Sequence, residues 1–237
     1  MYKFFEQYDN VVAVMSDVDD GDMRILGRKD DDKNITNRKK FCSKIGIDYK
    51  NVVSARLSHS NNVKIIDKNY NQYYKNTDAL ITKEKNIFLS VTTADCFPIL
   101  IYEPEAEIVA IIHAGWRGVV NNIISNTLEA MQKFSIDLNK IKIEVGPGIS
   151  QKNFEFDYEE ALKQFRQYDN HITSKDINNK VKINLKKIIY NQIMDYGING
   201  GNINISNICT FDNKNFFSAR RCGDESFDAM IIIIGMK

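Results

Sequence analysis

The segment from Ile108 to Ile112 is apolar at every position. A strand formed by such a segment has no polar face to turn to water, so other parts of the protein must cover both of its faces. Further apolar segments recur along the chain and alternate with segments of helical periodicity. This interleaving predicts an α/β fold.

The expected strands are apolar segments bounded by turn-forming residues. They are Val11–Met15, Val52–Leu57, Val63–Ile66, Ile87–Val91, Ile99–Tyr102, Ile108–His113, Ile141–Val145, Ile203–Cys209 and Met230–Ile234. The expected helices are Thr36–Ile45, Asn121–Phe134, Ala161–Tyr168 and Leu185–Tyr196. Asp157 and Glu160 resemble a capping box before the third helix. The charged segment Asp17–Asn34 is expected to form an exposed loop.

The size and charge of the chain limit its number of domains and the partners it can bind. With 237 residues, we expect one domain spanning residues 1–237. The 32 Lys and Arg residues balance 31 Asp and Glu residues, which argues against nucleic acid or an anionic membrane as a partner. The longest apolar run, Ala229–Ile234, is too short to span a bilayer. A start without a signal-like stretch and four widely spaced cysteines favour a cytoplasmic location.

Three residues that follow or end expected strands could carry chemistry: His59, Cys96 and His113. Taken singly, each also fits a structural role, as a surface histidine, a buried small side chain and a core histidine beside a tight turn. Together, two imidazoles and a thiolate form a ligand set that suits zinc, and three protein ligands leave the fourth position open, as catalytic zinc requires. The chain holds only three histidines, so few other sites compete.

Other polar residues lie near these positions in the sequence. Asp95 precedes Cys96 and could orient an imidazole, handle protons or simply cap its turn. Arg117 follows His113 in a glycine-containing turn and could supply a cation. Arg220 and Arg221 follow two phenylalanines and could bind phosphate or stack on a base, although a solvated turn explains them equally well.

Several segments resemble the laccase-domain or polyphenol-oxidoreductase family of purine nucleoside phosphorylases. The resemblance covers nearly the whole chain and is most specific around His113. The segments that carry it are Thr-Asp-Ala-Leu-Ile-Thr82, Ala-Asp-Cys-Phe-Pro98, His-Ala-Gly-Trp-Arg-Gly118, Gly-Pro-Gly-Ile149 and Phe-Phe-Ser-Ala-Arg-Arg221.

The resemblance implies a zinc ion held by His59, Cys96 and His113. It implies phosphorolysis of adenosine, inosine, guanosine and methylthioadenosine, together with adenosine deamination, so purine nucleosides and phosphate are the expected ligands. It also implies mixed β-sheets layered between helices, an α/β/β/α arrangement. On this basis we expect Cys96, His113 and Asp95 to be catalytic. We expect substrate contacts from four arginines, which are Arg56, Arg117, Arg220 and Arg221.

The sequence also departs from the family pattern. Leu57 and Ser60 stand where the family usually has Gln and Gly beside the first ligand, and Gly148 stands where it has Cys. Cys222 stands where the family has an acidic residue, and Glu225-Ser226-Phe227 stands where it has Thr-Gly-Arg. These changes fall among the residues expected to contact substrate, whereas the three expected zinc ligands keep the family pattern.

Three alternatives remain open. A copper-dependent polyphenol oxidase would use the same two histidines and one cysteine, but three histidines cannot ligate several coppers, so zinc is preferred over copper. A metal-free hydrolase would use Cys96 as nucleophile and His113 as base. A protein that lost its activity would only bind a partner.

Overall fold

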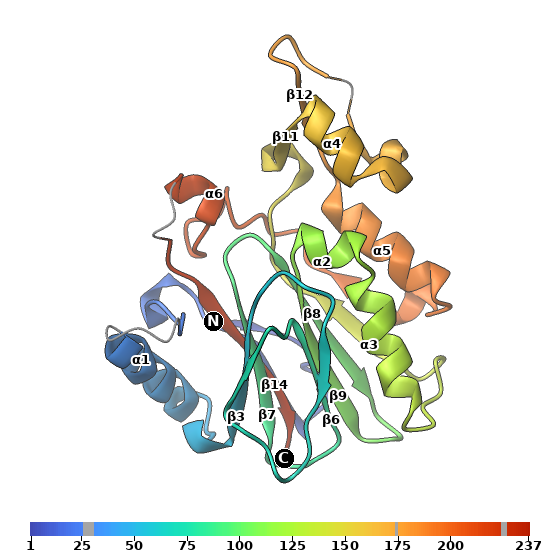
Figure 1. The fold of residues 1–237 in the computed structure, drawn as a ribbon. Coiled ribbons are helices and arrows are strands. Elements are labelled where there is room, and N and C mark those ends of the chain that lie inside the picture. The colour runs from blue at the N-terminus through green and yellow to red at the C-terminus, as the bar shows by residue number, and fades with distance from the viewer. Residues whose placement is uncertain (26–30, 174, 224–226) are drawn as a thin grey trace.

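The computed structural model describes residues 1–25, 31–173, 175–223 and 227–237, and its main body consists of two six-stranded sheets (Figure 1). The first sheet has the strand order β1 (Tyr2–Lys3), β2 (Val11–Met15), β14 (Met230–Met236), β7 (Phe88–Thr93), β3 (Val52–Arg56), β5 (Tyr73–Lys75). The second has the order β13 (Ile203–Ile205), β10 (Lys142–Val145), β8 (Phe97–Glu103), β9 (Ile108–Ala114), β6 (Ala79–Thr82), β4 (Val63–Ile65). Both sheets mix parallel and antiparallel pairs, as predicted.

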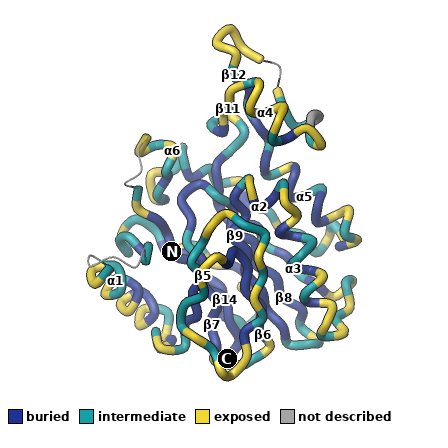
Figure 2. Tube along the Cα trace, in the orientation of Figure 1, coloured by how far each residue is buried: buried dark blue, intermediate teal, exposed yellow. Residues whose placement is uncertain are grey.

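Strand β9 shows why its sequence is apolar on both faces. Val109 and Ile111 pack between the two sheets, against residues of the first sheet such as Leu89 and Ile232. Ile108, Ala110 and Ile112 point the other way, into the core beneath the helices. Figure 2 shows the resulting dark, fully buried centre of both sheets.

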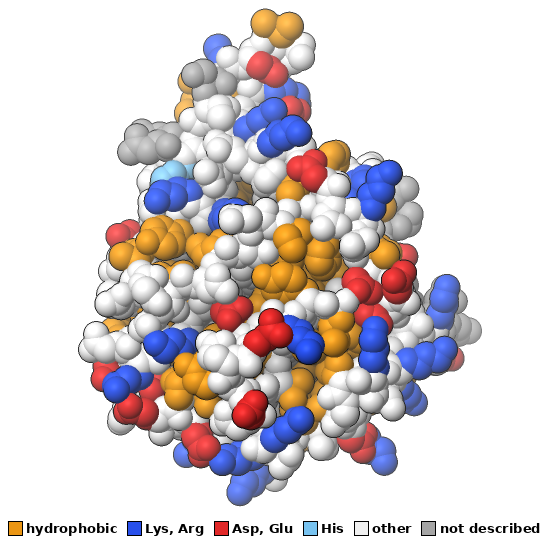
Figure 3. All heavy atoms as spheres, turned by 180° about the vertical axis from the view of Figure 1, so that it is seen from behind, with side chains coloured by type: hydrophobic (Ala, Val, Ile, Leu, Met, Phe, Trp, Pro, Cys, Tyr) orange, Lys and Arg blue, Asp and Glu red, His pale blue; other side chains and the backbone are white. Residues whose placement is uncertain are grey.

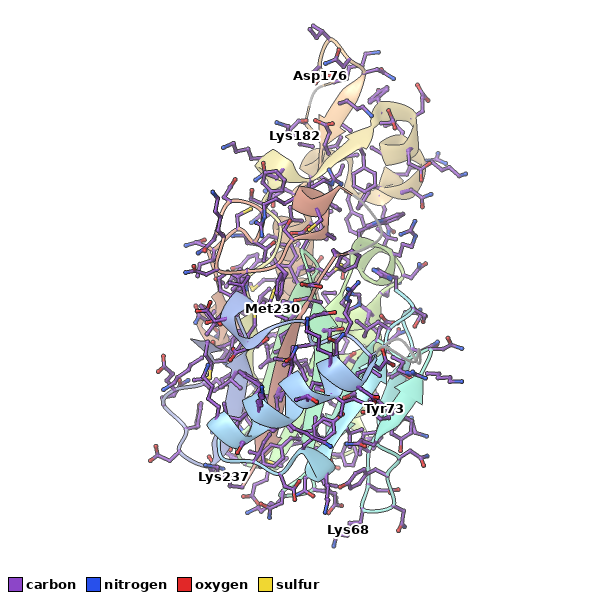
Figure 4. The ribbon with its side chains drawn as sticks, turned by 90° about the vertical axis from the view of Figure 1, so that its left-hand side faces the viewer. Lys68, Tyr73, Asp176, Lys182, Met230 and Lys237 are labelled. Carbon is purple, nitrogen blue, oxygen red and sulfur yellow. The ribbon has the colours of Figure 1, made fainter. Side chains whose placement is uncertain are left out.

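Helices cover the outer face of each sheet. Helix α1 (Asp31–Lys44) packs on the first sheet through Phe41 and Cys42, and Figure 4 shows it lying across the strands. The second sheet is covered by α2 (Trp116–Val120), α3 (Ile123–Gln132) and α5 (Leu185–Asp195). The layers therefore run helix, sheet, sheet, helix, which confirms the predicted α/β class and its layering.

A smaller unit projects beyond the sheets at one end (Figure 1). It consists of the two-stranded sheet β11 (Glu155–Asp157) and β12 (Lys180–Lys182) with α4 (Tyr158–Gln164). The remaining elements among the described residues are the short helix α6 (Ala219–Cys222) and five 3₁₀ turns, which are η1 (Val18–Asp20), η2 (Tyr49–Asn51), η3 (Gln151–Asn153), η4 (Arg166–His171) and η5 (Gly200–Asn202). Within the residues covered by the structure, no helix is long and apolar enough to cross a bilayer.

Some boundaries differ from those predicted. Helix α1 begins at Asp31 rather than Thr36, because Asp31 and Asp32 are favourable in a first turn next to the helix dipole. Residues 26–30 of the predicted loop lie outside the described residues. The predicted helix Asn121–Phe134 starts only at Ile123, since Asn122 has a φ of 65° and separates it from α2.

The other differences involve short elements and one cap. The predicted strand Ile203–Cys209 ends at Ile205, and Cys209 forms only an isolated bridge to Gly148. Asp157 stands at the start of α4, but its side chain accepts from Lys180 at 2.7 Å instead of capping the helix. Five strands are not predicted from the sequence, β1, β5, β6, β11 and β12, and each has four residues or fewer.

The core between the sheets leads to a stability prediction. Ile111→Ala should lower the free energy of unfolding by about 2–5 kcal/mol, because it leaves a cavity at a fully buried position. Ile177→Ala is the matched control, since Ile177 is 100% exposed, and it should change stability by less than about 0.5 kcal/mol. Urea denaturation of both variants measures the difference. Equal stability of the two would contradict the packing described for β9.

Candidate metal and active site

Three strands of the first sheet end at the same edge of the structure, and after each of them the chain crosses to the second sheet. Strands β3, β5 and β7 are neighbours and parallel, so their carboxyl ends meet at that edge. Each is followed by a strand of the second sheet, and the three connections carry His59, Asp78 and Cys96. Strand β9 ends at the same edge, because Ala114 pairs with Phe97 at the start of β8, and it supplies His113. The topology thus collects residues that are far apart in the sequence.

His59, Cys96 and His113 come together at this edge. One ligand atom from each lies within 4.8 Å of the other two, which makes them a group that could hold a metal ion. The Cys96 Sγ and His59 Nε2 atoms are 4.0 Å apart, and the two imidazole rings meet edge to face with centroids 4.9 Å apart. Zinc bonds of about 2.0–2.3 Å place tetrahedral ligand atoms roughly 3.3–3.6 Å apart, so only a small closure would be needed.

Asp78 organises the donors, although the sequence analysis assigned it no role. Its carboxylate is fully buried and accepts from His113 Nδ1 at 2.9 Å, from the His59 backbone N–H at 3.1 Å and from Ser60 Oγ at 2.7 Å. Because Asp78 holds Nδ1, Nε2 is the His113 nitrogen left to bind a metal. Asp78 lies in the matching segment Thr-Asp-Ala-Leu-Ile-Thr82, and this was the signal that could have found it.

The electrostatics of the site follow from these contacts. Burial alone would raise the pKa of Asp78, but hydrogen bonds from His113 and Ser60 hold it well below its usual range. Burial alone would also raise the pKa of the Cys96 thiol, yet the neighbouring His113, aided by His59, lowers it to about 6. The pKa of His113, which burial would lower, is raised to about 9 by Cys96 and Asp78. The site therefore favours the thiolate, the form of cysteine that binds metals.

Gly115 leaves the space in which the three donors meet. A Cβ at this position would lie 2.8 Å from His59 Cδ2, 3.2 Å from Cys96 Sγ and 3.3 Å from His113 Cε1. Gly118 plays a similar part in the next turn, where a Cβ would lie 2.9 Å from the Ser60 carbonyl oxygen. The glycines of the His-Ala-Gly-Trp-Arg-Gly118 segment thus allow close approach of the loop that carries His59.

Asp95 lies beside Cys96, but its carboxylate is engaged with another part of the chain. It accepts from Thr210 Oγ1 at 2.6 Å, from Ser218 Oγ at 2.9 Å and from the Arg220 backbone N–H at 2.8 Å. It is buried and adopts a φ of 90°, a strained value for a residue with a side chain. These contacts tie the turn that carries Cys96 to the start of α6. Its predicted role in proton handling stays a prediction.

A pocket of about 800 Å³ opens next to the three donors. His59, Cys96 and His113 line it, with Ile149 and Phe154 as apolar neighbours. Two of the predicted substrate contacts, Arg56 and Arg220, also line this pocket. The Arg220 guanidinium is exposed and donates to the carbonyl oxygens of Asn153 and Glu155 at 3.2–3.3 Å.

The structure does not bring the other two predicted arginines to this pocket. Arg117 stacks on the Trp116 ring, 4.3 Å from its centroid, and lines a separate hollow with Lys163 and Arg166. The Arg221 guanidinium donates hydrogen bonds to the backbone carbonyl oxygens of Thr210, at 2.7 Å, and Phe211, at 2.8 Å. The stacking of Arg117 and the hydrogen bonds of Arg221 are structural contacts that the sequence did not predict.

The structure describes most of the positions that depart from the family pattern. Gly148 packs against the Phe97 ring, and a Cβ there would lie 2.4 Å from a ring carbon, so a larger residue would displace that ring. Leu57 lines the pocket, and so does Phe227. Cys222 is exposed in α6, and residues 225 and 226 lie outside the described residues.

The fold and the donor cluster define a class of protein: two mixed sheets between helices, with two histidines and one cysteine gathered at a sheet edge. The family model described as multi-copper polyphenol oxidoreductase laccase matches residues 23–237. The chain belongs to this family, which confirms the resemblance seen in the sequence.

Similar proteins support this assignment. A purine nucleoside phosphorylase of Campylobacter jejuni is 35% identical over 184 residues, which cover 76% of this chain and 74% of that protein. An adenosine deaminase of an unknown prokaryotic organism is 31% identical over 195 residues, covering 77% and 74%. The Bacillus licheniformis hypothetical protein YfiH has the same fold, with a TM-score of 0.89 at 23% identity over 98% of this chain and 95% of that one. The relatives with assigned names are enzymes.

The space at Gly115 generates a prediction about metal binding. Gly115→Ala should reduce the bound metal per chain severalfold, because the added methyl group separates the donors. Gly201→Ala is a matched control, since a Cβ there approaches only the Asn199 side chain. Elemental analysis of both purified variants for zinc and copper provides the measurement. Full metal content in Gly115→Ala would show that the donors do not converge on an ion there.

The contacts of Asp78 generate a second prediction. Asp78→Asn should weaken metal affinity about 10- to 100-fold, because the amide cannot hold both the His113 ring and the His59 loop as the carboxylate does. Asp137→Asn, on the exposed surface, should leave affinity unchanged. Competition against a chelator of known affinity compares the two variants. Unaltered affinity in Asp78→Asn would rule out the organising role of Asp78.

Proposed function

We propose that this chain is a zinc-dependent purine nucleoside phosphorylase that also deaminates adenosine and acts on methylthioadenosine. The observation that carries the proposal is the convergence of His59, Cys96 and His113 in the lining of a pocket large enough for a nucleoside. The names of the similar proteins, purine nucleoside phosphorylase and adenosine deaminase, point to the same substrates. Purine nucleosides and phosphate are therefore the proposed ligands.

The residues present fit a zinc ion. Two imidazoles and one thiolate are ligands that zinc prefers, and a fourth position remains for a reactant. The hydrogen bond from His113 to the buried Asp78 is the outer contact that zinc-binding histidines usually make. His59, Cys96 and His113 would hold the ion, which acts when bound as a Lewis acid that activates water or polarises a substrate atom.

The surrounding residues of the chain would bind and orient the nucleoside. Phe154 and Ile149 offer apolar surface to a purine ring next to the donors. Arg56 and Arg220 supply positive charge at the pocket wall. Asp95 fixes the turn of Cys96 through its contacts with Thr210 and Ser218, so the thiolate keeps its direction. Asp95 also remains our candidate for proton handling.

Copper-dependent oxidation of phenols is a less well supported function, despite the description of the family. A multi-copper centre needs many imidazole ligands, whereas the chain has three histidines. The third, His171, lies in η4 and its Nε2 contacts the Asn191 side chain at 3.1 Å. In the part of the chain that the structure describes, the only group of potential ligands found is the one at His59, Cys96 and His113.

A metal-free hydrolase that uses Cys96 as nucleophile and His113 as base is the second candidate. The lowered pKa of Cys96 and the raised pKa of His113 favour it, since they resemble a thiolate–imidazolium pair. The two candidates differ in what Cys96 does. A ligand carries no covalent intermediate, whereas a nucleophile forms an adduct with substrate during turnover.

The location we propose is the cytoplasm. All four cysteines are free thiols, which fits a reducing compartment.

The proposed function predicts about one zinc per chain and turnover of a purine nucleoside panel. Cys96→Ala should lose both zinc and activity, because the anionic ligand is removed. His171→Ala is the control and should keep both, since His171 contacts Asn191 away from the donors. Elemental analysis and chromatographic assays with and without phosphate measure these outcomes. Full zinc in Cys96→Ala, or a substrate adduct on Cys96 detected by mass spectrometry, would favour the hydrolase instead.

A further inference from the structure

The pocket extends beyond the donor site to the face of the first sheet that α1 covers. There it is lined by Arg24, Arg38, Arg56 and Lys75, which we call the cationic arm. None of the sequence motifs pointed to this arm, apart from Arg56. Figure 4 faces this side and shows α1 across the strands, with Tyr73 near one edge of the sheet.

Arg38 is the most unusual member of the arm. It projects from α1, is only 3% exposed and lines the pocket. Its Nε donates to the Met23 carbonyl oxygen at 2.6 Å and its Nη1 donates to Ser54 Oγ at 2.9 Å, both of them neutral acceptors. Among the described residues, no carboxylate forms an ion pair with Arg38 within 4.0 Å. A buried cation without a paired anion is costly, so an anionic ligand would be strongly favoured beside it.

Polar side chains of β3 and β7 lie on the face of the first sheet that faces Arg38. Side chains alternate along a strand, so Ser54 and Arg56 of β3 share the face that α1 covers. Ser54 and Ser90 pair across β3 and β7, and their hydroxyls are 2.8 Å apart, which places Thr92 on this face as well. Arg56 is half-buried and its guanidinium lies 5.9 Å from the centre of the Tyr73 ring.

The remaining cations of the pocket are less available to a ligand. Arg24 already pairs with Asp22 at 3.1 Å and with Asp228 at 3.4 Å. Arg220 donates to two backbone carbonyl oxygens. Among the described residues, none of the guanidinium groups of Arg38, Arg56 and Arg220 has a carboxylate contact in this pocket. Arg38 donates to Ser54, two residues before Arg56 on the same face of β3, whereas Arg220 lies in α6. Arg38 and Arg56 are therefore the pair that we expect to converge on one anion.

We propose that the cationic arm is a phosphate subsite, in which Arg38 and Arg56 bind a phosphate dianion on the face of the first sheet that α1 covers. Thr92 lines the same part of the pocket and contributes a hydroxyl. The inference rests on the proposed function for the identity of the second ligand, a purine nucleoside. It assigns phosphate binding to residues other than Arg220 and Arg221.

This placement fits the chemistry of phosphorolysis. A nucleoside whose base faces the donors directs its ribose toward the arm. A phosphate oxygen then forms a bond to ribose C1′ while the bond from C1′ to the purine nitrogen breaks. The electron pair of that bond stays on the purine, and the proton of hydrogen phosphate passes to the base. Free base and ribose 1-phosphate result, with no further reactant.

The test measures binding of inorganic phosphate to the zinc-loaded full chain by isothermal titration calorimetry, which needs no turnover. Arg56→Gln should weaken phosphate binding by at least about tenfold, the loss expected for one charge-assisted contact. Arg38→Met, similar in length and apolar, should do the same. If Arg38→Met fails to fold, Arg56→Gln decides the question. Arg166→Gln, in the separate hollow, is the matched control and should bind phosphate normally.

Two further readouts separate the possible outcomes. Zinc content should be unchanged in Arg56→Gln, and Arg56→Lys should recover part of the affinity. Unaltered phosphate affinity in Arg56→Gln, with loss in Arg220→Ala or Cys96→Ala, would overturn the proposal and place phosphate at Arg220 or at the metal.

The same measurement distinguishes two sources of phosphate. Inorganic phosphate binding that adenosine leaves intact supports a co-substrate site. Adenosine 5′-monophosphate that binds far more tightly than either, and depends on Arg56, supports a nucleotide phosphate in the same subsite. Phosphate affinity that depends on Arg38 and Arg56 without nucleoside turnover would uphold the subsite and reject the proposed function.

Discussion

The hydrogen bonds of the buried Asp78 carboxylate hold the site together. A single side chain joins the end of β9, through the His113 ring, to the loop after β3, through the His59 and Ser60 backbone N–H groups. A fully buried carboxylate is stable only when its acceptor sites are filled, so these donors cannot drift away from it without a large cost. The same bonds fix which nitrogen of His113 faces Cys96. The direction of one ligand and the position of another therefore depend on a residue that would not itself touch the metal.

The fold explains why such a residue is available. Three parallel strands of the first sheet end at one edge, and after each of them the chain crosses to the second sheet. Crossing segments are short and polar, so their side chains are free to serve a site while the apolar strands on either side stay packed in two cores. The glycines at 115 and 118 then allow the segment after β9 to approach the His59 loop closely. The cores of the molecule are apolar, and the candidate site lies at the edge of the sheets that form them.

The sequence predicted the donor residues better than their surroundings. His59, Cys96 and His113 could be chosen because soft ligands are few in this chain and each follows or ends an apolar strand. Asp78 was assigned no role, since an aspartate before a strand is more often a turn residue, and only its place in the matching segment ending at Thr82 marked it. Arg117 and Arg221 stood in conspicuous motifs, yet their guanidinium groups contact Trp116 and backbone carbonyls.

Arg38 is the opposite case. The sequence of its helix is typical of a charged surface helix, and only the packing of α1 shows that this one cation is buried. Side-chain direction within a polar segment depends on tertiary contacts, which local pattern does not encode.

The pocket has two chemically different ends, and this division bears on how one site could serve two reactions. At the donor end, soft ligands and the apolar surface of Phe154 suit attack on a purine ring. At the other end, guanidinium groups suit a phosphate that attacks the sugar. In the proposed pose, the base of one bound nucleoside faces the donors and its C1′ atom faces the cationic arm. Substitutions that alter the donor end would then change both reactions, because base binding is common to them. Substitutions in the cationic arm would affect only the reaction that consumes phosphate, since deamination uses water. This asymmetry follows from the shape of the pocket and does not require two separate active sites.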